Sequence, residues 1–173
     1  MSINIIVAYC KNNGIGCNNN MPWKIKSDLQ KFKSMTIGNN NNAVIMGKNT
    51  FLSLNSNPLV KRDNLILSST LNIDNLNNNN ITKSFKNIES LKDFISIKNY
   101  DTIWIIGGEK IYKLFLESDI FQINNIYVTY INNDYECDTF FPIIDTNKFN
   151  FISKSIHNTQ NSELNIYDIV YKS

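Results

Sequence analysis

The chain has 173 residues and a mass of 20.0 kDa, which suits one domain built around a single hydrophobic core. Its 17 basic and 15 acidic residues give a formal net charge of +2 and are dispersed without a long run of one sign. Because nucleic-acid-binding surfaces concentrate positive charge, we expect no nucleic-acid partner.

The cysteines Cys10, Cys17 and Cys137 predict neither a disulfide framework nor a metal site. Their number is odd, no two of them are spaced as CxxC, and His157 is the only histidine. A reduced compartment fits this cysteine usage best. The partly apolar residues 1–10 are too few to span a membrane and lack a basic leader, so we expect a cytoplasmic protein without a membrane contact.

Apolar periodicity predicts short strands that alternate with helices along the chain. The predicted strands cover residues 3–9, 43–46, 64–68, 81–84, 102–106 and 126–131. The predicted helices cover residues 27–36, 50–54 and 88–97, and the apolar face of a fourth helix is marked by Ile111, Leu114 and Phe115. Such alternation indicates a parallel sheet covered by helices.

The remaining segments read as a terminal hairpin and as loops. Residues 149–156 and 164–171 resemble two paired strands that turn through residues 158–163. Asparagine tracts occupy residues 18–20, 39–42 and 77–80. Asparagine-rich tracts can aggregate, but each of these is short and asparagine favours turns, so we interpret them as surface loops.

Asp28 is the residue most indicative of chemistry. Ser27 can cap the predicted helix that contains it, and Leu29, Phe32 and Met35 give this helix an apolar face. A carboxylate beside an apolar stripe is costly to bury unless a polar group binds it. A flat ligand with adjacent N–H donors would satisfy it. The alternative is a first-turn aspartate that only interacts with the helix dipole.

A second candidate site follows the apolar strand 102–106. Gly107-Gly108 stands where this strand turns into a helix, so the backbone can approach a ligand closely and the helix N-terminus can face an anion. The pattern is not the GxGxxG fingerprint, and a plain tight turn explains it equally well by itself.

Taken in order, these motifs resemble the dihydrofolate reductase family. The resemblance extends from about residue 3 to about residue 170 and rests on Ile15-Gly16, Met21-Pro22-Trp23, Asp28-Leu29, Phe32, Val44-Ile45-Met46-Gly47-Lys48-Asn49-Thr50-Phe51 and Ile106-Gly107-Gly108. It implies a single domain of residues 1–173 with a three-layer α/β fold. Its central sheet would be eight-stranded, twisted and mainly parallel, with one antiparallel edge strand and four flanking helices. Small size makes a monomer the default expectation.

The resemblance implies NADPH as the cofactor. Lys48 then matches a basic position for cofactor phosphate, Ser68 and Ser69 match positions near the adenosine ribose and its 2′-phosphate, and a cis peptide joins Gly107 to Gly108. We expect Glu109 to point to solvent, because an acid would repel bound phosphate. The implied cofactor-binding residues are Ala8, Ile15, Gly16, Gly47, Lys48, Asn49, Thr50, Leu67, Ser68, Ser69, Ile106, Gly107, Gly108, Glu109, Lys110, Ile111 and Tyr112.

The resemblance implies dihydrofolate as the substrate. Arg62 aligns with an arginine that binds the α-carboxylate of the substrate's glutamate tail, although a surface ion pair with Asp63 is the alternative. The implied substrate-binding residues are Ile6, Val7, Ala8, Asp28, Leu29, Phe32, Ser53, Leu54, Leu59, Arg62, Ile106 and Thr129.

The implied catalytic residues are Asp28, Trp23, Thr129 and Tyr112. Asp28 would assist protonation of N5 through water, and Thr129 would hydrogen-bond both this carboxylate and the pterin amino group. Burial raises the pKa of such a carboxyl group while hydrogen bonds lower it, and sequence does not decide between them. His157 lies away from every motif, which suggests a structural or exposed residue.

Residues 14–16 and 18–20 flank a loop that should close over the nicotinamide, against a neighbouring loop at 138–142. Two other functions stay open. One is a related reductase of riboflavin synthesis that acts on a phosphoribosylamino-pyrimidine, and the other is a non-catalytic folate- or nucleotide-binding protein.

Overall fold

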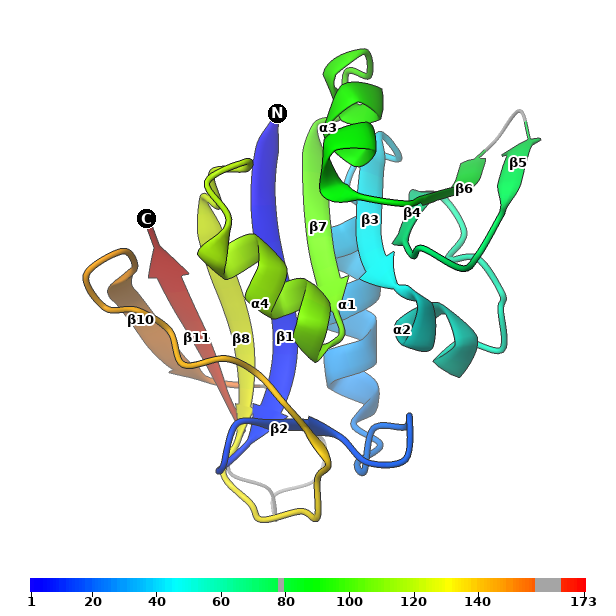
Figure 1. The fold of residues 1–173 in the computed structure, drawn as a ribbon. Coiled ribbons are helices and arrows are strands. Elements are labelled where there is room, and N and C mark those ends of the chain that lie inside the picture. The colour runs from blue at the N-terminus through cyan, green and yellow to red at the C-terminus, as the bar shows by residue number, and fades with distance from the viewer. Residues whose placement is uncertain (78–79, 158–165) are drawn as a thin grey trace.

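The computed structural model describes residues 1–77, 80–157 and 166–173. Within them, four helices flank a central nine-stranded sheet, and two short strands form a second sheet (Figure 1). The helices are α1 (Lys26–Ile37), α2 (Lys48–Ser53), α3 (Ile88–Ser96) and α4 (Glu109–Glu117). The strands are β1 (Ser2–Cys10), β2 (Gly14–Gly16), β3 (Asn42–Gly47), β4 (Asp63–Leu67), β5 (Asp74–Asn77), β6 (Asn80–Phe85), β7 (Thr102–Gly107), β8 (Asn125–Ile131), β9 (Thr139–Phe140), β10 (Asn150–Ile156) and β11 (Ile166–Lys172).

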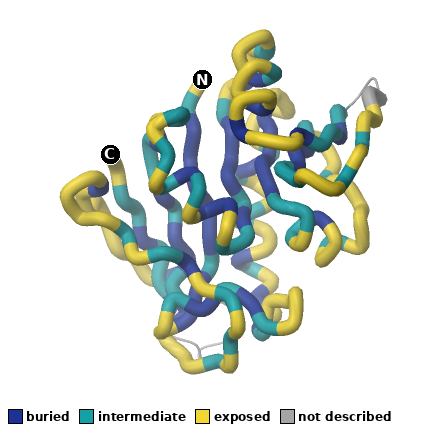
Figure 2. Tube along the Cα trace, viewed as in Figure 1, coloured by how far each residue is buried: buried dark blue, intermediate teal, exposed yellow. Residues whose placement is uncertain are grey.

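The strand order of the large sheet is β10-β11-β8-β1-β7-β3-β4-β6-β5. From β8 to β6 every neighbouring pair is parallel, whereas β11 runs antiparallel to β8 and β5 antiparallel to β6. Strand β1 lies inside the sheet between β8 and β7, and its near-continuous apolar run suits a strand that is covered on both faces. Figure 2 shows the central strands buried and the outer segments, including β10, exposed.

The predicted fold class, a mainly parallel sheet with four flanking helices, is confirmed. The sheet has one strand more than the predicted eight because Asp74–Asn77 pairs with β6 as a further antiparallel edge strand. Its sequence, Asp-Asn-Leu-Asn, carries no apolar alternation, so periodicity did not reveal it. At the other side β10 covers β11, so the antiparallel strand β11 is not itself the edge.

Alternating side chains of β1 divide the core between the two faces of the sheet. Ile5 and Val7 pack with the α3 and α4 side chains in the larger cluster, which includes Leu91 and Phe115. Ile6 points to the opposite face and packs with α1 and α2 side chains in a second cluster. Figure 1 accordingly shows α4 in front of the sheet and α1 behind it.

Helix α1 begins differently from the prediction. Ser27 lies inside the helix, and the N-cap is Ile25, which forms no side-chain capping bond. Burial of Ile25 and Trp23 in a third apolar cluster anchors the start of this helix instead. Leu29, predicted on the apolar face, is 47% exposed, whereas Phe32 is half-buried.

The asparagine tracts fulfil part of their prediction. Asn18 and Asn19 lie in an exposed loop with left-handed backbone, as expected. Asn42 departs from it, because this buried residue starts β3, donates to the carbonyl of Thr36 and accepts from the amide of Thr102. Residues 78–79 of the third tract and the predicted turn 158–163 lie outside the described residues.

No helix in the described part of the chain is long and apolar enough to cross a membrane.

Candidate active site

The carboxyl ends of three parallel strands meet at one edge of the sheet. Strand β1 pairs with β7, and β7 pairs with β3, so the turns that follow these strands lie side by side. Ligands of open α/β sheets bind at such an edge. Helix α1 places its first turn near the end of β1, and the α2 and α4 N-termini follow β3 and β7 directly.

Asp28 lies in the first turn of α1 and is 9% exposed. Burial raises the pKa of this carboxyl group above its ordinary value. The hydroxyl of Thr129 acts in the opposite direction, as do the positive charges of Lys31 and of protonated His157. Thr129 itself is buried on β8, directly opposite Ala8 of β1. The two effects left open by the sequence are therefore both present, and burial is the larger.

Trp23 precedes Asp28 by five residues in the sequence. Its ring packs against Tyr135, with ring centroids 5.3 Å apart. Its indole Nε1 is buried and has no hydrogen-bond partner among the described protein groups. A buried N–H donor in this situation is normally satisfied by an ordered water or a ligand.

Arg62 is 4% exposed, although an arginine is rarely buried without a partner. Its Nε donates to the carbonyl of Val60 at 3.1 Å, and Nη1 donates to the Thr36 hydroxyl at 2.5 Å. The guanidinium also lies 6.0 Å from the ring centroid of Phe32, and burial lowers its pKa. Asp63 accepts from Tyr100 and from the amide of Ile81, so the alternative ion pair with Arg62 is not formed.

Gly107, the last residue of β7, and Gly108, which follows it, provide a close backbone approach. The peptide between them is cis, as the resemblance implied. Gly107 has φ +109°, and a Cβ added there would lie 2.9 Å from Cε2 of Tyr112. The Tyr112 hydroxyl in turn donates to the carbonyl of Ile6 at 2.9 Å. Thr50 of α2 contacts Gly108, because its Oγ1 would lie 3.4 Å from a Cβ at that position.

Glu109 was predicted to point to solvent, and the structure shows in addition that it makes a backbone contact. Its side chain is half-buried, and its Oε2 accepts from the backbone amide of Phe140 at 3.2 Å. The carboxylate therefore links the start of α4 to β9 through a solvent-exposed hydrogen bond.

A second polar cluster lies where β3 and β4 end. Lys48 donates to the Thr70 hydroxyl at 3.0 Å, and Thr70 lies 3.4 Å from the Ser68 hydroxyl. Thr70 was not identified from the sequence, since an isolated threonine in a loop carries no pattern. Together these groups offer one ammonium and two hydroxyls to an anion.

The predicted loop contact is confirmed by the backbone. Strand β2 pairs with β9, the amide of Asp138 donates to Gly16, and the Asp138 carboxylate accepts from the amide of Asn18 at 2.8 Å. Between this loop and α2 is a surface depression of about 300 Å³ lined by Asn19, Asn20, Asn49, Leu52, Ser53 and Asn55.

The predicted site residues differ in exposure. Buried members are Ile6, Val7, Gly16, Trp23, Asp28, Arg62, Gly107, Ile111, Tyr112 and Thr129. Half-buried members are Ala8, Ile15, Phe32, Gly47, Lys48, Thr50, Leu54, Leu59, Leu67, Ser68, Ile106, Gly108 and Glu109. Exposed members are Leu29, Asn49, Ser53, Ser69 and Lys110. The side chain of Val7 packs on the α4 face of the sheet, away from the face that carries Asp28.

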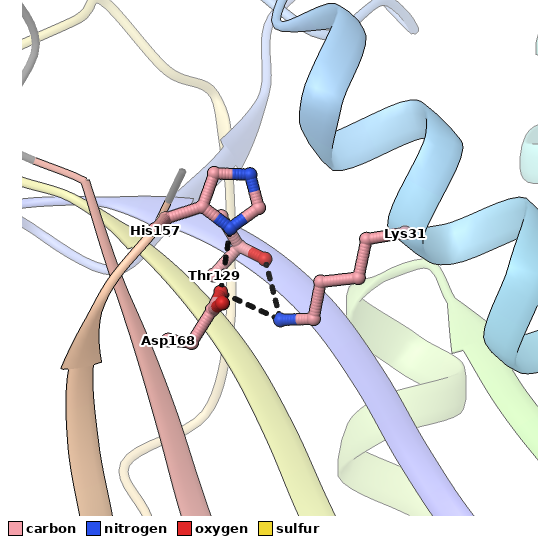
Figure 3. Close-up of polar contacts among 4 residues, drawn as sticks. All are labelled: Lys31, Thr129, His157 and Asp168. Carbon is pink, nitrogen blue, oxygen red and sulfur yellow. Dashed lines mark hydrogen bonds and ion pairs between the residues drawn. The ribbon is translucent and has the colours of Figure 1, made fainter. Parts of the chain in front are cut away.

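Three residues beside the site were missed by sequence reasoning. Lys31 forms an ion pair with Asp168 at 2.6 Å, and His157 Nδ1 lies 2.8 Å from the same Asp168 oxygen (Figure 3). Of the two alternatives predicted for His157, the structural one holds, because the residue is 6% exposed and bound to Asp168. The available signal was the spacing of Lys31, three residues after Asp28 and thus on the same helix face.

Replacing Gly107 by alanine should destabilise the fold. The positive φ and the contact with Tyr112 leave no room for a Cβ, so we expect a loss of about 1–3 kcal/mol in the free energy of unfolding. Gly108→Ala is the matched control, since its Cβ would make an ordinary contact at 3.4 Å. Denaturant unfolding of both variants provides the measurement, and equal stability of the two would contradict this assignment.

Asp28→Asn should stabilise the ligand-free protein at pH 7. A raised pKa means that the folded protein binds the proton more tightly than the unfolded chain, so the charged carboxylate costs stability above the folded pKa. This cost disappears below the unfolded value of about 3.9. Thermal midpoints should therefore be higher than wild type at pH 7 and converge as the pH falls. The exposed Asp134→Asn is the control, and a lower midpoint for Asp28→Asn at pH 7 would refute the reasoning.

Comparison with known proteins agrees with this geometry. The family model described as dihydrofolate reductase matches residues 2–173. The dihydrofolate reductase of Gallus gallus is 36% identical over 161 residues, which are 88% of this chain and 84% of the relative. That of Staphylococcus haemolyticus is 32% identical over 175 residues, covering 99% and 93%.

A solved structure has the same fold. Dihydrofolate reductase from Enterococcus faecalis, complexed with NADP(H) and RAB-propyl, superposes with a TM-score of 0.81 at 23% identity, and the match covers 99% of this chain and 95% of the other. At this identity the likeness concerns the fold. The family match and the curated relatives establish that the chain belongs to the dihydrofolate reductase family.

Proposed function

We propose that the chain reduces 7,8-dihydrofolate to 5,6,7,8-tetrahydrofolate with NADPH, and that Asp28 is the group that binds the pterin and assists protonation of N5. Family membership supports the reaction. The observation that carries the role of Asp28 is a buried carboxylate, 9% exposed, whose pKa is raised by burial and lowered by the Thr129 hydroxyl.

The residues at the glycine turn fit a dinucleotide. The absence of side chains at Gly107 and Gly108 leaves a backbone surface that a Cβ would fill, and Lys48, Ser68 and Thr50 add a charge and hydroxyls nearby. These residues would hold the pyrophosphate and the 2′-phosphate. When bound, NADPH supplies the hydride that is transferred to C6 of the substrate.

Asp28 would orient the substrate and assist the transfer of a proton to N5. A pterin ring presents a ring N–H and an amino N–H side by side, and a carboxylate accepts both at once. The Thr129 hydroxyl lowers the pKa of Asp28, and by donating to the carboxylate it would fix one of its oxygens. The unsatisfied Nε1 of buried Trp23 would hold the water that carries the proton to N5. The Tyr112 hydroxyl donates to the carbonyl of Ile6 and so joins α4 to β1 beside Gly107.

Arg62 would bind the tail of the substrate. Its Nη2 makes no hydrogen bond among the described residues, and no carboxylate of the described chain forms an ion pair with it. A guanidinium held by Val60 and Thr36 is preorganised for a carboxylate that arrives with the ligand. The apolar side chains of Phe32, Leu54 and Leu59 lie in the same cluster and would contact the ring between the two ends.

The rival functions are separable by binding and by turnover. A phosphoribosylamino-pyrimidine has no α-carboxylate for Arg62, so competition between it and dihydrofolate distinguishes the two substrates. A non-catalytic protein would bind NADPH and dihydrofolate without oxidising the cofactor. Following NADPH oxidation after dihydrofolate is added tests the proposal, and wild-type protein that binds both ligands without turnover would overturn it.

The same proposal covers organisation and location. A single domain of residues 1–173 agrees with one continuous sheet and with the family match over residues 2–173. We propose a monomer in the cytoplasm that needs dihydrofolate and NADPH but no nucleic acid, membrane or metal. Three free cysteines are consistent with a reduced compartment.

Asp28→Asn should lower turnover at neutral pH by about 10²–10⁴-fold, because an amide can neither carry the charge nor assist the proton transfer. NADPH affinity should stay within about twofold of wild type, since no phosphate contact changes. Single-turnover hydride transfer and fluorescence titration of NADPH are the two measurements. Wild-type turnover in this variant would eliminate the role.

Arg62→Lys should raise KM for dihydrofolate by roughly tenfold and largely spare kcat, because the lost fork contact is equal in bound substrate and transition state. A reduced pterin that lacks the glutamate tail is the control substrate, and its KM should be the same for both proteins. An unchanged KM for dihydrofolate would show that Arg62 does not bind the tail.

Lys48→Ala should weaken NADPH binding more than NADH binding, because only NADPH carries the 2′-phosphate. We expect a loss of roughly tenfold for NADPH, which corresponds to one charge-assisted hydrogen bond. Lys92→Ala on the exposed side of α3 is the matched control. Equal losses for the two cofactors would remove the phosphate role.

A further inference from the structure

Three titratable side chains that influence the pKa of Asp28 converge from three separate elements. Lys31 comes from α1, Asp168 from β11, and His157 follows β10 (Figure 3). Lys31 Nζ lies 2.6 Å from Asp168 Oδ1, and His157 Nδ1 lies 2.8 Å from the same oxygen. Exposed fractions of 23% for Lys31, 27% for Asp168 and 5% for His157 separate this cluster from ordinary surface ion pairs.

The cluster reaches the site through Thr129. Lys31 Nζ lies 3.5 Å from Thr129 Oγ1, a long contact in which the ammonium can only donate. Since the threonine oxygen then accepts from Lys31, its own hydrogen is free to donate to another acceptor, and the Asp28 carboxylate, whose pKa this hydroxyl lowers, would be that acceptor. Lys31 thereby favours the orientation in which Thr129 donates to Asp28.

On this basis, and resting on the proposed function, we propose that Lys31, Asp168 and His157 form a positioning network that orients the Thr129 hydroxyl toward Asp28 and sets the charge around that carboxylate. None of the three needs to touch the substrate. Asp168 holds the flexible Lys31 side chain in place, and His157 fixes Asp168 from the other side.

The charges around Asp28 act in both directions. Lys31 and protonated His157 lower its pKa, whereas Asp168 raises it. Burial and, less strongly, the negative charge of Asp28 raise the pKa of Tyr112 on α4, so this hydroxyl is a further titratable group within the electrostatic range of Asp28. The positive charge of Lys31 therefore favours the ionised form of Asp28 against the effect of burial, and the negative charge of Asp168 limits how far it does so.

Two substitutions should change the pKa of Asp28 in opposite directions. Lys31→Met removes a positive charge and should raise this pKa by roughly 0.5–1 unit. Asp168→Asn removes a negative charge but keeps the Oδ1 acceptor that holds Lys31, and should lower the pKa by a similar amount. Lys31→Arg keeps the positive charge and should leave the pKa of Asp28 at its wild-type value. Lys83→Met, which breaks the distant surface pair with Asp74, is the matched control and should change nothing.

The direct readout is the pH titration of the Asp28 ¹³Cγ signal in the ligand-free protein, assigned with Asp28→Asn. This readout does not depend on turnover, so it tests the network even where the proposed reaction fails. In active protein the acid limb of the kcat/KM profile should shift in the same direction. Shifts of one sign in both variants, or no shift in either, would overturn the proposal, because a purely structural role gives no opposite pair.

The route through Thr129 has its own test. In a Thr129→Val background the shift caused by Lys31→Met should be smaller, because only the direct charge effect remains. A shift of undiminished size would show that Lys31 acts on Asp28 without the hydroxyl.

Discussion

The candidate active site depends on one carboxylate that is buried at the edge of the sheet. Asp28 is 9% exposed, and this burial is the main cause of its raised pKa. A carboxylate in such a place destabilises the ligand-free protein and is useful only for what it binds. The Thr129 hydroxyl, Lys31, His157 and Asp168 all act on this one carboxyl group, so the polar groups near it are few and specific.

The parallel sheet makes that arrangement possible. Strands β1, β7 and β3 end together, so the glycine turn, the start of α2 and the first turn of α1 converge although they lie far apart in the chain. The alternation within β1 sends Ile6 to the α1 face and Val7 to the α4 face. One strand thus supports both the site and the opposite core.

Much of this could be predicted from the sequence, because strong patterns carried it. Apolar runs such as residues 102–106 identified the central strands, and the ordered motifs identified the family. The short polar strand β5 and the cap of α1 were not predictable, because hydrogen bonding and burial of Ile25 decide them without a sequence period. The cluster of Lys31, Asp168 and His157 was missed because its members lie far apart in the sequence and meet only where α1 packs beside β11 and the end of β10.

The most direct test of the central claim is a crystal structure of the protein with NADP⁺ and folate. The account predicts both Asp28 oxygens within about 3.2 Å of two adjacent N–H donors of the pterin, with the nicotinamide beside the Gly107-Gly108 turn. A pterin that binds elsewhere, or an Asp28 side chain turned to solvent in that complex, would contradict it.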